Sequence, residues 1–146
     1  MNPFDLKSAL LARHAQHVVL IHFPIALFLM GAFFDVAAQW TRKAALATAA
    51  HYNLKVAAFC SVPAVITGVL AWRLQLEGQR LKGTLLLHLI FGLGSAVLIW
   101  LVWWVHSRAA RTPERALPAY RLPLEVIAVT VVAMTAHLGG FLSGVN

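Results

Sequence analysis

The 146-residue chain is too apolar to be an ordinary water-soluble domain. Apolar residues make up 60% of it and charged residues only 12%, whereas a soluble domain usually carries about 25% charged residues. The net charge of +7 would indicate nucleic acid as the partner of a soluble protein. Here the basic residues lie between apolar segments, so anionic lipid is the expected partner and nucleic acid is not. The single cysteine, Cys60, excludes an internal disulfide, a thiolate cluster and a c-type haem attachment motif.

Four long runs without Asp, Glu, Lys or Arg define the fold class. They cover residues 14–34, 56–72, 83–107 and 126–146, and each is near the roughly 17–25 residues that a helix needs to cross a bilayer. We therefore predict spans at about 18–39, 54–75, 84–106 and 122–144. Short connections favour an all-α, up-down-up-down transmembrane bundle, a single domain over residues 1–146 with both termini on one face.

The segment before the first span differs from the spans in character. Residues 3–13, PFDLKSALLAR, predict a short amphipathic stretch lying at the membrane surface. A cleaved signal peptide is not favoured, because the apolar run that follows is long for the core of such a peptide. The terminal face carries five Lys and Arg residues: Lys7, Arg13, Arg73, Arg80 and Lys82. The opposite face carries seven: Arg42, Lys43, Lys55, Arg108, Arg111, Arg115 and Arg121. The positive-inside rule then places the termini outside the cytoplasm.

Three histidines on three different spans are expected at a similar depth near the terminal face. His22 lies about one turn inside the first span, His88 about one turn inside the third, and His137 about two turns before the end of the fourth. With a rise of about 1.5 Å per residue, their levels should agree within several ångströms. Intramembrane histidines are costly and commonly functional. We therefore expect a cofactor at this level.

Neutral imidazole suits the iron of haem b, and two imidazoles on facing helices give a six-coordinate, electron-transferring iron. His22 with His88 is the preferred axial pair, and His137 is an alternative ligand. Two other interpretations stay open. Each histidine could simply hydrogen-bond to a carbonyl or water, or His14 and His17, three residues apart on one helix face, could form a metal site together with His22.

Small and charged residues near these histidines allow two interpretations each. Gly92 and Ser95 share a helix face with His88 and could leave room for a flat macrocycle or only permit close helix packing. Arg73, just after span two on the same side, could hold a haem propionate or a quinone headgroup, or anchor the helix. No pairing of a nucleophile with a base and no phosphate-binding loop is visible, so independent catalysis is not expected.

At the opposite face, the spans carry two carboxylates and two histidines. Asp35 and Glu125 could carry protons, but near an interface we expect carboxylates that are solvated or paired with arginine. For His51 and His106 we expect solvation by water or lipid headgroups.

Several motifs resemble the domain-of-unknown-function 2231 family of small four-helix bacterial membrane proteins. These are His14 and His17 followed by IHFPIAL at 21–27, Asp35 late in span one, GVLAW at 68–72, His88, and the pair Gly139 and Gly140. Members often end in a YxHGVGV-like tail, whereas this chain ends FLSGVN and His137 precedes the glycine pair. The resemblance implies a bacterial inner membrane and a haem-binding or redox role similar to cytochrome b, and it supports His22 and His88 more than His137.

The expected function is therefore a haem b electron-transfer subunit of a larger membrane oxidoreductase. Its partners would be other membrane subunits and a redox partner such as a c-type cytochrome or quinone. The alternatives are a cofactor-free structural anchor subunit and a histidine-based metal-binding membrane protein.

Overall fold

The computed structural model describes residues 13–75, 78, 80–111 and 117–144, with side chains described for these residues except 13–15 and 75. Within this part of the chain the secondary structure consists of four helices. They are α2 (Arg13–Thr41), α3 (Ala44–Gln75), α4 (Gly83–Ala109) and α5 (Arg121–Leu142). The predicted interfacial segment, residues 3–13, lies outside the described residues except for Arg13, where α2 begins.

All four helices are long and apolar enough to cross a membrane, which confirms the all-α transmembrane prediction. A helix is the natural form for such segments because it satisfies its own backbone polar groups, which lipid cannot do. The second helix begins ten residues earlier than the predicted span, at Ala44 rather than at position 54. The reason is local: the alanine-rich stretch 44–50 favours helix, and the chain turns just before it at Arg42, whose φ is 55°.

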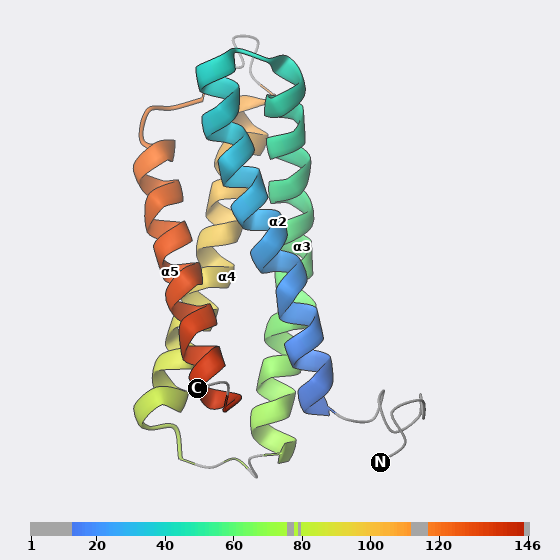
Figure 1. The fold of residues 1–146 in the computed structure, drawn as a ribbon, viewed down its shortest axis with the longest axis vertical. Helices are drawn as coiled ribbons and strands as arrows, with labels where there is room; N and C mark the ends of the chain where they lie inside the picture. The colour runs from blue at the N-terminus through green and yellow to red at the C-terminus, as the bar shows by residue number, and fades with distance from the viewer. Residues whose placement is uncertain (1–12, 76–77, 79, 112–116, 145–146) are drawn as a thin grey trace.

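The helices pack in two pairs. Helix α2 lies along α3, and α4 lies along α5, while the two pairs meet mainly between α3 and α4 (Figure 1). In Figure 1 the connection from α2 to α3 lies at the upper end, whereas α2 begins and α5 ends towards the lower end. Pro24 and Pro63 stand inside α2 and α3 without ending either helix.

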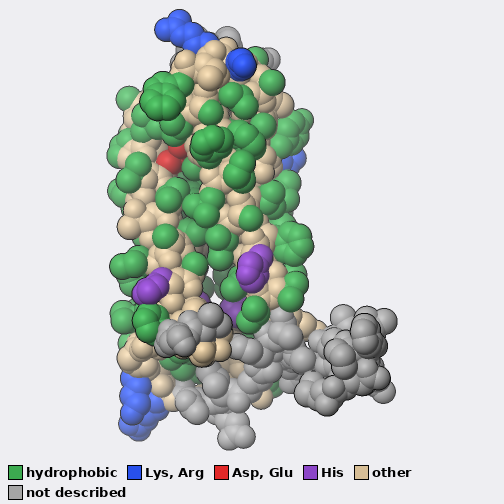
Figure 2. Space-filling model, viewed as in Figure 1, with side chains coloured by type: hydrophobic (Ala, Val, Ile, Leu, Met, Phe, Trp, Pro, Cys, Tyr) green, Lys and Arg blue, Asp and Glu red, His purple; other side chains and the backbone are tan. Residues whose placement is uncertain are grey.

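A core of buried side chains holds the middle of the bundle together. Phe28 and Leu54 are fully buried, and Val102 and Ala128 pack in the same cluster, so every helix contributes one of these four. Many large apolar side chains point outward instead, and Figure 2 shows them covering the visible face along most of its length. An outer surface of this kind is suited to contact with lipid chains, because lipid is as apolar as the side chains themselves.

Candidate functional site

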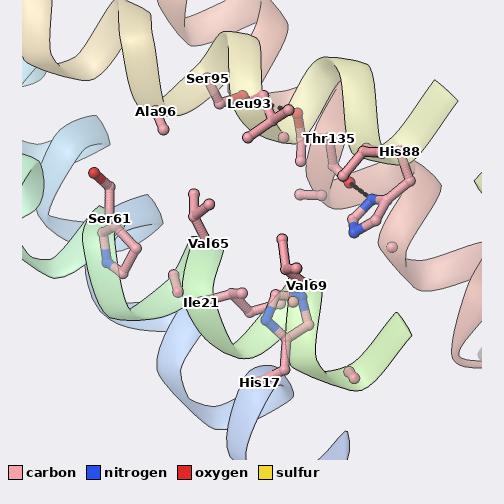
Figure 3. Close-up of a pocket in the computed structure, with 18 of the residues that line it drawn as sticks. His17, Ile21, Ser61, Val65, Val69, His88, Leu93, Ser95, Ala96 and Thr135 are labelled. Atoms are coloured by element: carbon pink, nitrogen blue, oxygen red, sulfur yellow. Dashed lines mark hydrogen bonds between the residues drawn. The ribbon is translucent and has the colours of Figure 1, made fainter. Parts of the chain in front are cut away.

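A cavity of about 300 Å³ opens between the two helix pairs in the half of the bundle where α2 begins and α5 ends. All four helices line it, and most of its wall is aliphatic or glycine. The polar exceptions include one histidine from each pair, His17 on α2 and His88 on α4, which Figure 3 shows at the same end of the cavity. Their ring centroids lie 6.5 Å apart with the ring planes at 79°. We call this cavity the histidine pocket.

The imidazole of His88 is fixed by a hydrogen bond to the neighbouring helix. Its Nδ1–H donates to the backbone carbonyl of Thr135 on α5, at 3.2 Å. That carbonyl can only accept, so the proton of neutral His88 resides on Nδ1 and the lone pair on Nε2. This is the usual arrangement of a metal-binding histidine, whose second nitrogen is held by a carbonyl or a carboxylate.

His17 has the same arrangement, with a threonine in place of the carbonyl. Its Nδ1 lies 3.3 Å from Oγ1 of Thr67 on α3. The Thr67 hydroxyl already donates to the carbonyl of Pro63, at 2.8 Å, so towards His17 it acts as acceptor. The Nδ1–H tautomer follows for neutral His17, again with the lone pair on Nε2.

A glycine stands against each of these rings. A Cβ added to Gly68 on α3 would lie 2.9 Å from Cε1 of His17, and one added to Gly139 on α5 would lie 3.2 Å from Cε1 of His88. Both distances are shorter than ordinary van der Waals contact. The absence of a side chain at these two positions therefore leaves room for each imidazole in its observed place.

The other predicted site residues lie elsewhere. His22 is exposed, and its Nδ1–H donates to the carbonyl of Val18 in its own helix, at 2.6 Å. His137 is also exposed and packs edge-on against Phe141, with ring centroids 4.8 Å apart. Neither lines the histidine pocket.

Two further predicted residues lie at the start of α2 and the end of α3. Arg73 is exposed, with its guanidinium 4.8 Å from the ring of Trp72, which does line the histidine pocket. His14 falls in the first turn of α2, where side chains are not described. Of the predicted histidines, the structure thus brings His88 together with His17 rather than with His22 or His137.

His17 and His22 point in different directions from the axis of α2. At about 3.6 residues per turn, His17, Phe28 and Asp35 fall on one face of α2, with His17 and Asp35 five whole turns apart. His22 falls well away from that face. Helical spacing alone predicts this shared face, which includes positions 17, 21, 24, 28 and 35. It carries a histidine at one end, a carboxylate at the other and apolar residues between them.

A second group of polar side chains lies buried at the other end of the bundle. His106 on α4 donates from Nε2 to Oε1 of Glu125 on α5, at 2.8 Å, and Arg121 donates from Nε to Oδ2 of Asp35 on α2, at 3.0 Å. We call these four residues the polar cluster. Asp35 and Glu125 were each expected to be solvated or paired with an arginine. Asp35 is paired with one, whereas the expectation is wrong for Glu125, which is 3% exposed and pairs with His106 instead. The expected solvation of His106 is wrong, because it is only 5% exposed: α4 runs about one turn past it, and Glu125 satisfies its ring instead of water.

Comparisons with known proteins give a single family. No curated protein and no solved structure matches the chain. A family model described as "predicted membrane protein" matches residues 13–145, which is nearly the whole chain and includes all four helices. The chain therefore belongs to the domain-of-unknown-function 2231 family of predicted membrane proteins.

Proposed function

We propose that this protein binds haem b between its two helix pairs, with His17 and His88 as axial ligands, and passes electrons within a larger complex of the bacterial inner membrane. The observation that carries the proposal is the pairing of two imidazoles across an apolar pocket, 6.5 Å between ring centroids. Two imidazoles at this separation could both reach one metal ion held between the helix pairs.

The residues around the pair fit such a group. The Nδ1–H of each histidine is held by an acceptor on a neighbouring helix, which directs the Nε2 lone pair to a metal. Gly92 and Ala96 on α4 and Ala64 on α3 line the wall with little bulk, so a flat ring system meets few side chains. Bound haem would supply reversible one-electron chemistry, and the apolar wall of the histidine pocket would limit access of water to it.

A basic side chain near the end of α3 could pair with the propionates of a haem. Arg73 is exposed beside Trp72 of the pocket wall, and guanidinium pairs well with carboxylates such as haem propionates. Arg73 is exposed at the end of α3, and the positive-inside bias predicts that this end of the bundle lies outside the cytoplasm. Both points support electron exchange with a partner on the extracytoplasmic side, a c-type cytochrome or a quinone. The apolar outer faces of the helices are suited to packing against other membrane subunits as well as lipid.

Spectroscopy of four single variants tests the proposal. The full chain, expressed with haem supplied and purified in detergent, should show a b-type α band in the reduced-minus-oxidised spectrum. His17→Ala and His88→Ala should each abolish the low-spin spectrum, because each removes one axial ligand. His22→Ala and His137→Ala are matched controls and should retain it.

Two results would contradict the proposal. A purified protein without a b-type band despite haem supply would favour the cofactor-free anchor. A spectrum lost in His22→Ala but retained in His17→Ala would return the ligand role to the pair preferred from the sequence.

A further inference from the structure

The polar cluster contains more buried negative charge than buried positive charge. Asp35 is 2% exposed, Glu125 3% and Arg121 8%, so two carboxylates face one guanidinium in the interior of the bundle. Burying an uncompensated charge costs several kcal/mol. A cation bound among these side chains would place positive charge next to both carboxylates.

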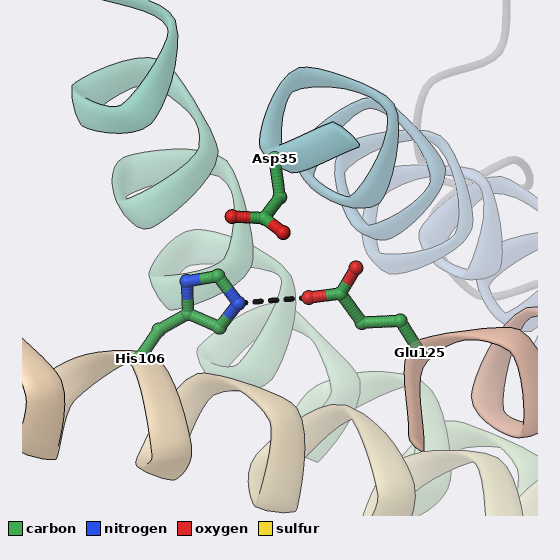
Figure 4. Close-up of side chains that lie close together, drawn as sticks. All are labelled: Asp35, His106 and Glu125. Atoms are coloured by element: carbon green, nitrogen blue, oxygen red, sulfur yellow. Dashed lines mark hydrogen bonds and ion pairs between the residues drawn. The ribbon is translucent and has the colours of Figure 1, made fainter. Parts of the chain in front are cut away.

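The donor atoms are arranged to share one ion. Asp35, His106 and Glu125 come from three different helices, and one ligand atom from each lies within 4.8 Å of the other two. Figure 4 shows the three side chains converging from α2, α4 and α5 on a common space. One imidazole nitrogen with carboxylate oxygens is a donor set typical of divalent transition metals such as zinc, manganese and iron.

Unsatisfied polar atoms give an independent sign of a missing ligand. Oε2 of Glu125 is buried and has no hydrogen-bond partner among the described residues, although a buried carboxylate oxygen normally accepts at least one bond. In Figure 4 the Glu125 side chain extends from α5 towards His106 and Asp35. Nδ1 of His51 on α3 is likewise buried without a hydrogen-bond partner in the described part of the chain.

We infer that the polar cluster binds one divalent transition-metal ion through His106, Glu125 and Asp35. The cation takes the place of the Nε2 proton that His106 donates to Glu125, and that proton is released to water. Arg121 and Gln39 both donate to Oδ2 of Asp35, at 3.0 and 2.8 Å, and thereby orient that carboxylate for the ion. This site is separate from the histidine pocket and does not depend on haem binding there.

Cobalt titration tests the inference without interference from the histidine pocket. Untagged full-length protein carrying His17→Ala and His88→Ala, stripped with chelator in detergent, is titrated with Co²⁺ and followed by its visible d–d absorption. We expect one Co²⁺ per chain, displaced by Zn²⁺. Added His106→Gln or Glu125→Gln should each weaken Co²⁺ binding by at least about tenfold. His137→Gln, which alters an exposed histidine on α5, should leave it unchanged.

Glutamine can still hydrogen-bond at both positions, and circular dichroism checks that each variant keeps its helices. Absence of Co²⁺ absorption in the parent protein would overturn the inference, and so would a Co²⁺ affinity unchanged from the parent in both glutamine variants. A ¹⁵N spectrum in which His106 is doubly protonated in the presence of equimolar Zn²⁺ would also overturn it, because neither ring nitrogen could then bind the ion. The haem spectrum of the wild-type chain is measured separately, so failure of one proposal leaves the other standing.

Discussion

At the scale of single residues, the position of each pocket imidazole depends on a glycine in a neighbouring helix. Gly68 stands against His17, and Gly139 against His88, each with its missing Cβ within 3.2 Å of the ring. The rings also have fixed hydrogen-bond partners in Thr67 and in the backbone of residue 135. A side chain at either glycine would therefore move a ring away from its partner rather than fill empty space.

We expect Gly68→Ala and Gly139→Ala each to lower haem retention, by about tenfold in affinity, because outer-shell support of a metal-binding histidine is commonly worth that much. Gly68→Ala should have the larger effect, since its Cβ makes the shorter contact. Gly140→Ala is the matched control, because nothing lies within 4 Å of its added Cβ. The measurement is haem content per chain after purification. A haem content equal to that of the wild-type chain in all three variants would contradict the prediction, because it would show that the imidazole rings can shift without loss of haem.

At the scale of elements, α2 and α3 form the most extensive helix pair among the described residues. Gly31 on α2 faces Leu54 on α3, and a Cβ there would lie 2.8 Å from the Leu54 Cγ and 3.2 Å from its backbone nitrogen. A backbone atom cannot move aside as a side chain can. The two helices would have to separate to admit even one methyl group.

Gly31→Ala should therefore destabilise the fold by about 1–3 kcal/mol, the usual cost of overpacking. Gly94→Ala on α4 is the matched control, since its nearest neighbour, a methyl group of Val131, would lie 3.9 Å away. Unfolding in mixed detergent micelles, followed by circular dichroism, measures the difference. A Gly31→Ala variant as stable as Gly94→Ala would argue against tight packing of α2 on α3.

The four helices also show which features of the fold can be predicted from the sequence. Uncharged runs predict four membrane helices because composition alone decides whether a segment prefers lipid. Depth along each helix is also readable from the sequence, and His88 lies in the expected half of the bundle. Pairing across helices is harder to predict, because it depends on how each helix is rotated about its axis. The closeness of His17 to His88 and the contact of His106 with Glu125 depend on this rotation.

At the scale of the whole molecule, charge sets the expected orientation in the membrane. The connection between α2 and α3 carries Arg42 and Lys43, and the face that includes it holds seven basic residues against five on the other. This bias predicts that the α2–α3 connection is cytoplasmic. The histidine pocket would then lie towards the extracytoplasmic side and the polar cluster towards the cytoplasm.

Cysteine labelling tests this orientation and the alternation of the helices. In a Cys60→Ala background, Thr41→Cys and Thr84→Cys place single thiols at exposed positions at the end of α2 and the start of α4 without changing charge. In intact spheroplasts, a membrane-impermeant maleimide should label Thr84→Cys only. Thr41→Cys should react only in inside-out vesicles. The reverse labelling pattern would show that the protein has the opposite orientation in the membrane. Equal labelling of both thiols from one side would contradict the alternating direction of the helices.

The apolar layer formed by Phe28, Leu54, Val102 and Ala128 has an electrical consequence. It separates the histidine pocket from the polar cluster, so in an energised membrane much of the voltage falls across it. Carrying one elementary charge across the full membrane costs or yields about 2.3 kcal/mol per 100 mV. If the histidine pocket holds haem as proposed, an electron exchanged between it and a partner on the same side crosses little of that field. Electron transfer there should accordingly be almost independent of membrane potential, whereas transfer through the layer would perform electrical work.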